Sequence, residues 1–380
     1  MEPIAIEQSD IQITEDKFQH FTVKLFTLTF RQAAIIKQEM LSLGAEAVVS
    51  WNAGSGGNYE AELSGTIDHF QQFVIKLYQQ SLGLPEIAAQ IEAVLSNHES
   101  HNVLPILINQ KTYNLNAKTY VMGIINITPD SFSKDGLYEQ ENYIDRAIRQ
   151  ARQMVEEGAD FLDLGAESSR PGAAQITGEE EAKRLLPVLK ELAAAVDVPI
   201  SVDTYKPEVA EAALNYGAAM INDIWGLQSP EDPAQRMARL VGEAKVPVII
   251  MHNKTQPTYQ HLIEEIIDFL SKSIEIASNH GVGFQQIIID PGIGFGKTYH
   301  DNLKILQNLD QFKELGRPIL LGPSRKSFIG ITLDLPVEER LEGTIATAVW
   351  GVTKGMNIIR VHDVKAVARA IRMCDAIVHE

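Results

Sequence analysis

The sequence predicts an α/β protein: a (β/α)8 TIM barrel preceded by a small α+β domain. Eight short apolar runs alternate with amphipathic runs of helical period over roughly 260 residues, the size of one such barrel. Continuous apolar strands joined by helices are typical of a parallel sheet covered by helices. An open doubly wound sheet is the alternative, and it is less favoured because such sheets seldom need so many regular repeats.

Composition limits the location and the partners. The chain has 380 residues and a net charge of −17, which argues against nucleic acid or a membrane surface as a partner. A single cysteine, Cys374, excludes an internal disulfide framework and a Cys-based zinc site. The start Met1-Glu2-Pro3 lacks a signal-peptide pattern, and no apolar stretch is long enough to span a bilayer. These features predict a cytoplasmic protein.

Residues 1–102 are predicted to form a small α+β module of unknown role that ends in a polar linker. Strands follow from alternating apolar residues and helices from the 3.6-residue period. The predicted elements are the strands Phe21–Thr29, Ala45–Ser50 and Tyr59–Leu63, the helix Arg31–Leu43, and one or two helices within Ile67–Leu95. The module has no evident phosphate loop, metal-ligand cluster or nucleophile constellation. We therefore expect a docking or oligomerisation role rather than a second active site.

Residues 103–380 carry the predicted barrel. Its strands are Val121–Asn126, Phe161–Gly165, Ile200–Asp203, Met220–Asn222, Val246–Met251, Ile287–Asp290, Ile319–Leu321 and Asn357–Arg360. Its helices are Tyr143–Glu157, Glu179–Ala194, Pro207–Tyr216, Leu262–Asn279, Asp301–Lys313, Arg340–Lys354 and Val364–Val378. A hairpin at Ile106–Leu115 is predicted to plug the bottom of the barrel.

Polar side chains follow nearly every predicted strand. They are Asn126, Asp163 with Glu167, Asp203, Asn222 with Asp223, His252, Asp290, and Arg360 with His362. One such residue is most simply a helix cap or a turn residue. Seven strands of eight ending this way instead predict a site at the carboxyl end of the barrel, where barrel enzymes carry their chemistry.

The charges in these loops indicate the ligand. Arg170, Lys297, Arg325, Lys326, Arg360 and His362 are basic, although the protein as a whole is acidic. A cationic pocket on an anionic protein predicts an anionic ligand, most simply a phosphate. Three further residues, Asp203, Asn222 and Asp290, offer the acceptors and donors that hold a planar heterocycle.

The glycine-rich segment Gly292–Thr298 is not a P-loop. Only three residues separate Gly292 from Gly296, whereas the P-loop needs four before its Gly-Lys pair. The spacing also fails as a dinucleotide fingerprint. We interpret the segment as a loop whose backbone passes close to a ligand, with Phe295 as a pocket wall.

Several of these segments together resemble the dihydropteroate synthase family. The first signature is Asn126–Ser133 and the second is Leu162–Ala173. The resemblance continues in order through Val202–Thr204, Asn222–Ile224, Asp290–Gly292, Gly294–Lys297, Ser324–Ser327 and Arg360–Asp363. One motif is moderately specific, whereas the whole ordered set is highly specific.

The resemblance implies an activity and a set of roles. The activity is condensation of 6-hydroxymethyl-7,8-dihydropterin diphosphate with 4-aminobenzoate, with release of diphosphate. By this resemblance Asp203, Asn222, Asp290 and Lys326 bind the pterin, and Asn126, Arg360 and His362 bind the diphosphate. Asn126 also meets Mg²⁺, the expected cofactor. The implied aminobenzoate site consists of Phe132, Ser169, Arg170, Pro171, Phe295 and Ser327. Asp135, Lys326, Arg360 and His362 are the implied catalytic residues of an SN1-like step, and the implied assembly is a homodimer.

The first loop departs from the family pattern. Ser133-Lys134-Asp135-Gly136 replaces the usual Ser-Asp-Gly-Gly, so the carboxylate is displaced by one position. Ser169 replaces the commoner Thr and keeps its hydroxyl. Two other functions are alternatives: a folate-dependent methyltransferase and a pterin-binding barrel without turnover. The runs Ser324–Ser327 and Arg360–His362 disfavour the methyltransferase, which has no diphosphate to bind.

Overall fold

The computed structural model describes residues 20–52, 58–100, 103–109, 111–128, 142–168 and 175–378. The chain divides into two compact units, Met1–Ser100 and His101–Glu380. Among the described residues, no helix combines the length and the apolar character needed to cross a membrane.

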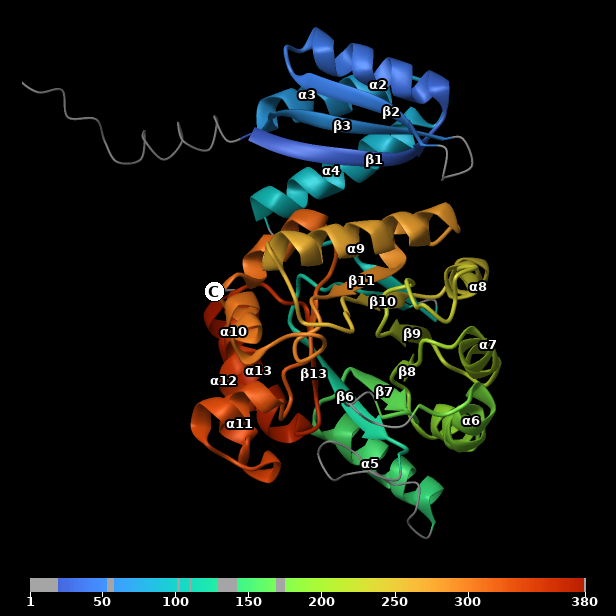
Figure 1. Cartoon of the computed structure of the whole chain (residues 1–380), viewed down its shortest axis with the longest axis vertical. Coiled ribbons are helices and arrows are strands. Elements are labelled where there is room, and N and C mark those ends of the chain that lie inside the picture. The colour runs from blue at the N-terminus through green and yellow to red at the C-terminus, as the bar shows by residue number, and fades with distance from the viewer. Residues whose placement is uncertain are drawn as a thin grey trace, which may run out of the picture. The chain divides into compact units, whose positions relative to one another are not determined.

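The first unit is a three-stranded antiparallel sheet with three helices (Figure 1). Its elements are β1 (His20–Leu28), α2 (Phe30–Ser42), β2 (Glu46–Asn52), β3 (Asn58–Thr66), α3 (Ile67–Tyr78) and α4 (Leu84–Ser100). The strand order is β1-β3-β2. Capping boxes at Thr29 and Thr66 begin α2 and α3. The three predicted strands and the break near Gly83 are confirmed, while α4 continues to Ser100 through most of the segment predicted as a linker.

The first unit has its own apolar core. Alternate residues of the strands, such as Leu25 and Leu63, face the apolar sides of the helices. Ile36, Phe70 and Phe73 from α2 and α3 are fully buried against them. Because this core contains only residues of the first unit, the unit has the anatomy of an independent domain.

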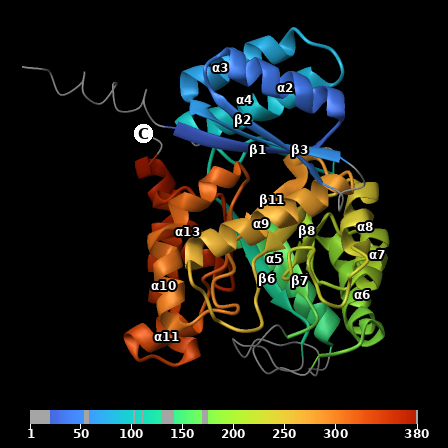
Figure 2. The ribbon, with the colours of Figure 1, turned by 45° about the horizontal axis from the view of Figure 1, so that its top comes forward.

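The second unit is an eight-stranded parallel barrel with its helices outside, as predicted (Figure 2). The strands are β6 (Tyr120–Asn126), β7 (Phe161–Gly165), β8 (Ile200–Asp203), β9 (Met220–Asp223), β10 (Val248–Met251), β11 (Ile287–Asp290), β12 (Leu320–Leu321) and β13 (Ile358–Val361). They pair in the order β11-β10-β9-β8-β7-β6-β13-β12. A parallel bridge between Ile289 and Ile319 brings the two ends of this order together as a barrel.

Nine α-helices surround the described barrel, of which sequence analysis found seven. They are α5 (Tyr143–Glu157), α6 (Gly178–Ala195), α7 (Pro207–Asn215), α8 (Arg236–Ala244), α9 (Leu262–Asn279), α10 (Tyr299–Gln307), α11 (Ser327–Leu333), α12 (Leu341–Thr353) and α13 (Val364–Val378). The two missed helices, α8 and α11, are only 9 and 7 residues long, too short to show the helical period clearly. The predicted helix at Asp301–Lys313 is split into α10 and the 3-10 segment Leu309–Leu315.

A hairpin closes the amino-terminal end of the barrel, as the sequence predicted. Its strands are β4 (Ile106–Ile108) and β5 (Lys111–Tyr113), paired antiparallel. Their buried residues pack into one apolar cluster with residues from the beginnings of the barrel strands, including Phe161, Ile249 and Ile288. The amino end is therefore filled by apolar side chains, and the carboxyl end is left for chemistry.

Candidate active site

Polar side chains gather at the carboxyl ends of the barrel strands. Asn126, Asp203 and Asp290 are the last residues of β6, β8 and β11, and Asn222 lies one residue before the end of β9. Because the strands are parallel, all these ends lie on one face of the barrel. The structure therefore brings together predicted residues that are far apart in the sequence.

Arg360 of β13 is the centre of a buried charge network. Its Nε donates to Asp163 Oδ2 at 2.6 Å and its Nη2 donates to Asp203 Oδ2 at 2.9 Å. Asn222 Nδ2 donates to the same Asp163 oxygen at 3.1 Å. Burial alone would lower the pKa of Arg360, but the two carboxylates raise it, so the guanidinium stays charged. The side chain predicted to hold diphosphate is thus directed at two carboxylates.

Asp203 and Asp290 resist ionisation. Burial raises the pKa of Asp203, and the Arg360 guanidinium opposes that rise. Burial likewise raises the pKa of Asp290, while the Gly292 N–H, donated to Asp290 Oδ1 at 2.7 Å, lowers it. Both groups are therefore acceptors whose charge depends on nearby donors.

Asp163 is a site residue to which sequence analysis assigned no role. Its side chain is fully buried, and its Oδ1 has no hydrogen-bond partner among the described residues. A buried acceptor of this kind is expected to find a donor, so Oδ1 is suited to receive an N–H from a ligand. The signal in the sequence was a charge inside the apolar run Phe-Leu-Asp-Leu-Gly.

The loop after β11 carries a second set of predicted residues. Lys326, which follows β12, reaches this loop: its Nζ donates to the Ile293 carbonyl and lies 4.3 Å from the centre of the Phe295 ring. Burial lowers the pKa of Lys326 to about 8. Gly292 has a φ of +73°, and a Cβ there would lie 2.0 Å from the His252 carbonyl oxygen. The backbone of this loop thus passes close to another part of the chain, and its predicted approach to a ligand stays a prediction.

The partly buried Lys297 and the buried His252 form a pair beside this loop. Lys297 Nζ lies 2.8 Å from His252 Nδ1 and donates to the Phe295 carbonyl at 2.9 Å. Burial and the neighbouring lysine lower the pKa of His252 to about 2, and burial lowers that of Lys297 to about 7. Lys297, predicted among the cations facing an anion, here braces its own loop.

The loops after β12 and β13 are joined at two points. Ser324 Oγ lies 2.8 Å from His362 Nδ1 and accepts from the His362 backbone N–H at 3.1 Å. Arg325 donates through Nε and Nη2 to the two oxygens of Asp363, at 2.8 and 2.5 Å. On its other side His362 Nε2 lies 3.5 Å from Asn126 Nδ2. Arg325, predicted to face an anionic ligand, is instead paired with a carboxylate.

A pocket of about 690 Å³ opens at the carboxyl ends of strands β7 to β11. Its wall includes Asp203 at the end of β8, Tyr205 and Trp225 after β8 and β9, and Phe295 and Lys297 after β11. Of the other predicted site residues, Ser327 is the first residue of α11, directly after Lys326. Phe132, Asp135, Ser169, Arg170 and Pro171 lie outside the described residues.

The pterin binding enzyme family matches residues 122–362 of this chain, most of the barrel. The match includes every strand end described above. The chain therefore belongs to the pterin binding enzyme family.

Relatives narrow the assignment. The dihydropteroate synthase of Clostridium beijerinckii is 48% identical over 272 residues, 71% of this chain and 98% of that protein. That of Bacillus subtilis is 48% identical over 263 residues, 69% and 90% of the two chains. A Clostridium difficile dihydropteroate synthase structure, determined in the presence of pteroic acid, is 48% identical with a TM-score of 0.65, and covers 69% of this chain and 98% of that one. Within this family, the chain belongs with the dihydropteroate synthases, which are transferases of folate biosynthesis.

One relative extends beyond the barrel. A probable bifunctional folylpolyglutamate synthase/dihydropteroate synthase from Haloferax volcanii is 36% identical over 358 residues, 90% of this chain and 42% of that protein. The barrel unit alone cannot supply that length, so the similarity extends into the first unit.

Proposed function

We propose that this dihydropteroate synthase joins 6-hydroxymethyl-7,8-dihydropterin diphosphate to 4-aminobenzoate with Mg²⁺, through an SN1-like step. The observation that supports the pterin as substrate is the set of buried polar groups at the strand ends. Asp163, Asp203, Asn222 and Asp290 offer acceptors and a carboxamide within one barrel mouth. A planar heterocycle with several N–H groups suits that set.

The pterin is proposed to lie among Asp203, Asn222, Asp290 and Lys326. Carboxylates of raised pKa accept ring and amino N–H groups when they are ionised, and a lysine donates to ring nitrogen or carbonyl oxygen. The aminobenzoate is proposed to lie towards Phe295 and Ser327, with Phe132, Ser169, Arg170 and Pro171 completing its site. A Xanthomonas albilineans dihydropteroate synthase, 36% identical with a TM-score of 0.67, has been solved with 4-aminobenzoic acid, and it covers 72% of this chain and 98% of that one.

The diphosphate is proposed to lie near Asn126, His362 and Arg360, with Mg²⁺ as its counter-ion. The described residues contain no cluster of three or more His, Cys, Asp or Glu that could hold a metal. Mg²⁺ commonly keeps several waters and binds through one or two protein oxygens plus substrate phosphates. The carboxamide oxygen of Asn126 fits that limited requirement. When bound, Mg²⁺ would stabilise negative charge on the leaving diphosphate.

The chemistry requires little covalent work from the protein. The C–O bond breaks with its electron pair going to diphosphate, which leaves a cation on the pterin methylene. The aminobenzoate nitrogen then bonds to that carbon and loses a proton. Arg360 and Lys326 would supply positive charge at the leaving group, His362 would offer it a ring N–H, and the pterin residues would hold the methylene in place. Asp135 is the carboxylate proposed to stabilise the cation.

Positional isotope exchange tests the order of these events. The pterin diphosphate is labelled with ¹⁸O at the oxygen that joins the pterin methylene to the α-phosphorus, and is incubated with enzyme, Mg²⁺ and an aniline of low basicity. Scrambling of label into non-bridging positions is expected, since the C–O bond breaks before attack. No scrambling, together with a rate that depends strongly on amine basicity, would indicate direct displacement.

Assembly and location form a separate proposal. Ile331, Trp350 and Met373, on α11, α12 and α13, are exposed apolar side chains. They support a homodimer through these helices, which sedimentation of the full chain would measure. A cytoplasmic location is proposed as well, and fractionation of cells would test it.

A further inference from the structure

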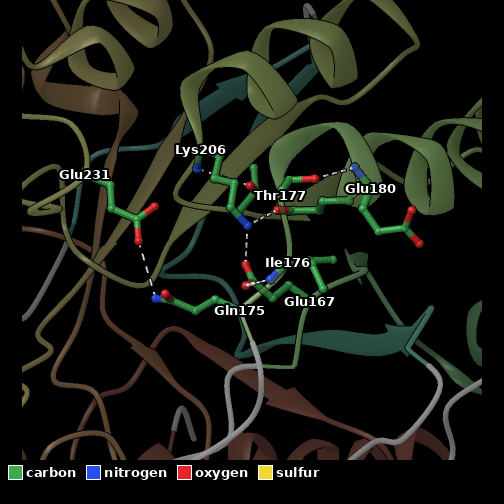
Figure 3. Close-up of polar contacts among 9 residues, drawn as sticks. Glu167, Gln175, Ile176, Thr177, Glu180, Lys206 and Glu231 are labelled. Carbon is green, nitrogen blue, oxygen red and sulfur yellow. Dashed lines mark hydrogen bonds and ion pairs between the residues drawn. The ribbon is translucent and has the colours of Figure 1, made fainter.

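Lys206 is a buried cation that the proposed chemistry does not use. It is only 6% exposed and occupies the N-cap position of α7, between β8 and that helix. Its Nζ lies 2.5 Å from Glu167 Oε2 (Figure 3). The same Nζ lies 2.7 Å from Glu181 Oε2. The three side chains come from neighbouring β/α units, because Glu167 follows β7 and Glu181 belongs to the first turn of α6.

Glu167 connects this cation to the wall of the pocket. Its second oxygen, Oε1, accepts from the Ile176 backbone N–H at 3.1 Å (Figure 3). Glu167 and Ile176 flank the segment 168–175, so one carboxylate joins the two ends of that segment. Ser168 and Gln175, the adjoining residues, line the 690 Å³ pocket together with Glu167 itself.

Stability alone does not account for this cluster. It places two carboxylates around one ammonium, and Glu181 is fully buried. Burial raises the pKa of Glu181, which means that its charged form is disfavoured there, even though Lys206 opposes the rise. Buried ion pairs of this kind often stabilise less than apolar residues of the same volume. If the Lys206 ammonium fixes the Glu167 carboxylate, the presence of a buried charge at position 206 is explained.

The pterin side of the mouth is held by other contacts. Asp203 is bonded to Arg360 at 2.9 Å, and Asn222 to Asp163 at 3.1 Å. The Thr204 backbone N–H donates to the Asn222 carbonyl at 3.1 Å, so the end of β8 is fixed to β9 without Lys206. Losing the Lys206 ammonium should therefore disturb the Glu167 wall and leave the pterin groups in place.

We propose that Lys206 is a positioning residue for the aminobenzoate side of the pocket, and that it acts through Glu167. The ammonium fixes the Glu167 carboxylate, which in turn holds Ile176 and sets the wall formed by Ser168 and Gln175. This inference rests on the proposed function, because it assigns that wall to the amine substrate. In this account different groups position the two substrates. Contacts at the strand ends hold the pterin, and the buried Lys206 shapes the site of 4-aminobenzoate.

The variant Lys206→Met in the full chain tests the inference. Methionine keeps the apolar stem and removes the charge. In steady-state assays with Mg²⁺ and both substrates, we expect the KM for 4-aminobenzoate to rise about tenfold or more, since small misplacement of a positioning wall has effects of this size. The KM for the pterin diphosphate should stay within about twofold. Lys190→Met, at an exposed lysine of α6, is the matched control and should change neither value.

Two conservative variants keep the test decisive if Lys206→Met does not fold. Lys206→Arg retains the charge and should restore most of the 4-aminobenzoate KM. Glu167→Gln keeps an oxygen for the Ile176 N–H but weakens the link to Lys206, so it should raise the same KM by an intermediate amount. Equal rises in both KM values, or an unchanged 4-aminobenzoate KM in Glu167→Gln, would overturn the positioning role.

The wild-type protein, assayed in parallel, separates this inference from the proposed function. If wild type forms 7,8-dihydropteroate and Lys206→Met binds 4-aminobenzoate normally, only the role of Lys206 is wrong. If wild type releases no diphosphate with these substrates, the proposed function fails and the inference fails with it.

Discussion

The two ends of the barrel are built from the same strands but differ in what they bury. At the amino end, Phe161, Ile249 and Ile288 pack with the β4–β5 hairpin into an apolar cluster. At the carboxyl end, only two residues further along the same strands, Asp163 and Asp290 are buried polar groups. The difference shows that one end provides stability and the other uses some of it for chemistry.

The charged groups at the carboxyl end of the barrel make its stability depend on their partners. Arg360 satisfies two carboxylates at once, and removal of either kind of partner leaves a charge without compensation. The apolar end contains no such dependence, because the loss of an apolar contact leaves no charge without compensation. Substitutions at the two ends should therefore have different signatures in activity and in stability.

The largest effect is expected for Arg360→Met. Asp163 and Asp203 would lose their cation, which should lower the free energy of unfolding by about 3–5 kcal/mol and reduce kcat/KM by about a thousandfold. Thermal unfolding and steady-state kinetics measure the two changes. Arg369→Met, at an exposed arginine of α13, is the control. Activity within tenfold of wild type would show that the network is not part of the site.

Phe161→Ala should affect stability without affecting chemistry. The ring is 1% exposed and lies 5.2 Å from the Tyr113 ring, centre to centre. Its loss should cost about 3–5 kcal/mol of unfolding free energy, while kcat stays within about twofold below the unfolding temperature. Urea unfolding and an assay at low temperature check both parts. A kcat that falls along with stability would contradict the separation of the two ends.

Ser324→Ala should have a smaller and more selective effect. The hydroxyl contacts both Nδ1 and the backbone N–H of His362, so it helps to set the orientation and the protonated nitrogen of that ring. Losing one such bond should weaken diphosphate binding about tenfold, with the 4-aminobenzoate KM little changed. Product inhibition by diphosphate measures this. Thr332→Ala, which removes an α11 hydroxyl elsewhere, is the control, and equal inhibition constants in all three proteins would refute the role.

The smallest effect is expected for Glu181→Gln, and it depends on pH. Because burial raises the pKa of Glu181 in the folded state, its contribution to stability is full below the unfolded pKa and is lost as pH rises through the folded pKa. The glutamine amide cannot ionise. As the pH rises, the variant should therefore become more stable relative to wild type, by on the order of 1 kcal/mol in the free energy of unfolding. Thermal unfolding from pH 4 to pH 8 follows the difference, and a gap that does not grow with pH would contradict this account.

Much of the fold was predictable from local pattern. The eight strands, seven helices and the hairpin follow from apolar runs, helical period and glycine stops, because each depends on residues close in sequence. The short helices α8 and α11 escaped detection because one or two turns give too few repeats. Residues such as Asp203 and Asp290 were found because a polar group after an apolar strand marks the end of that strand.

Partnerships were not predictable in the same way. Arg325 and Lys297 were both predicted to face an anion; Arg325 is bonded to Asp363, and Lys297 lies against His252 while it also lines the pocket. A charge in a sequence has no visible partner until the chain is folded. Lys206 was missed for the same reason: in the sequence it is an ordinary lysine before a helix.

The sequence by itself determined the barrel, the order of its strands and the list of residues at their ends. These follow from side-chain period and from the rule that parallel strands share one carboxyl face. Only the tertiary structure decided which side chains meet, since closure of the barrel brings Arg360 to Asp163 across 197 residues of sequence. The polar residues that the sequence placed at one edge became an active-site mouth because closure and burial paired some of their charges and left other groups to a ligand.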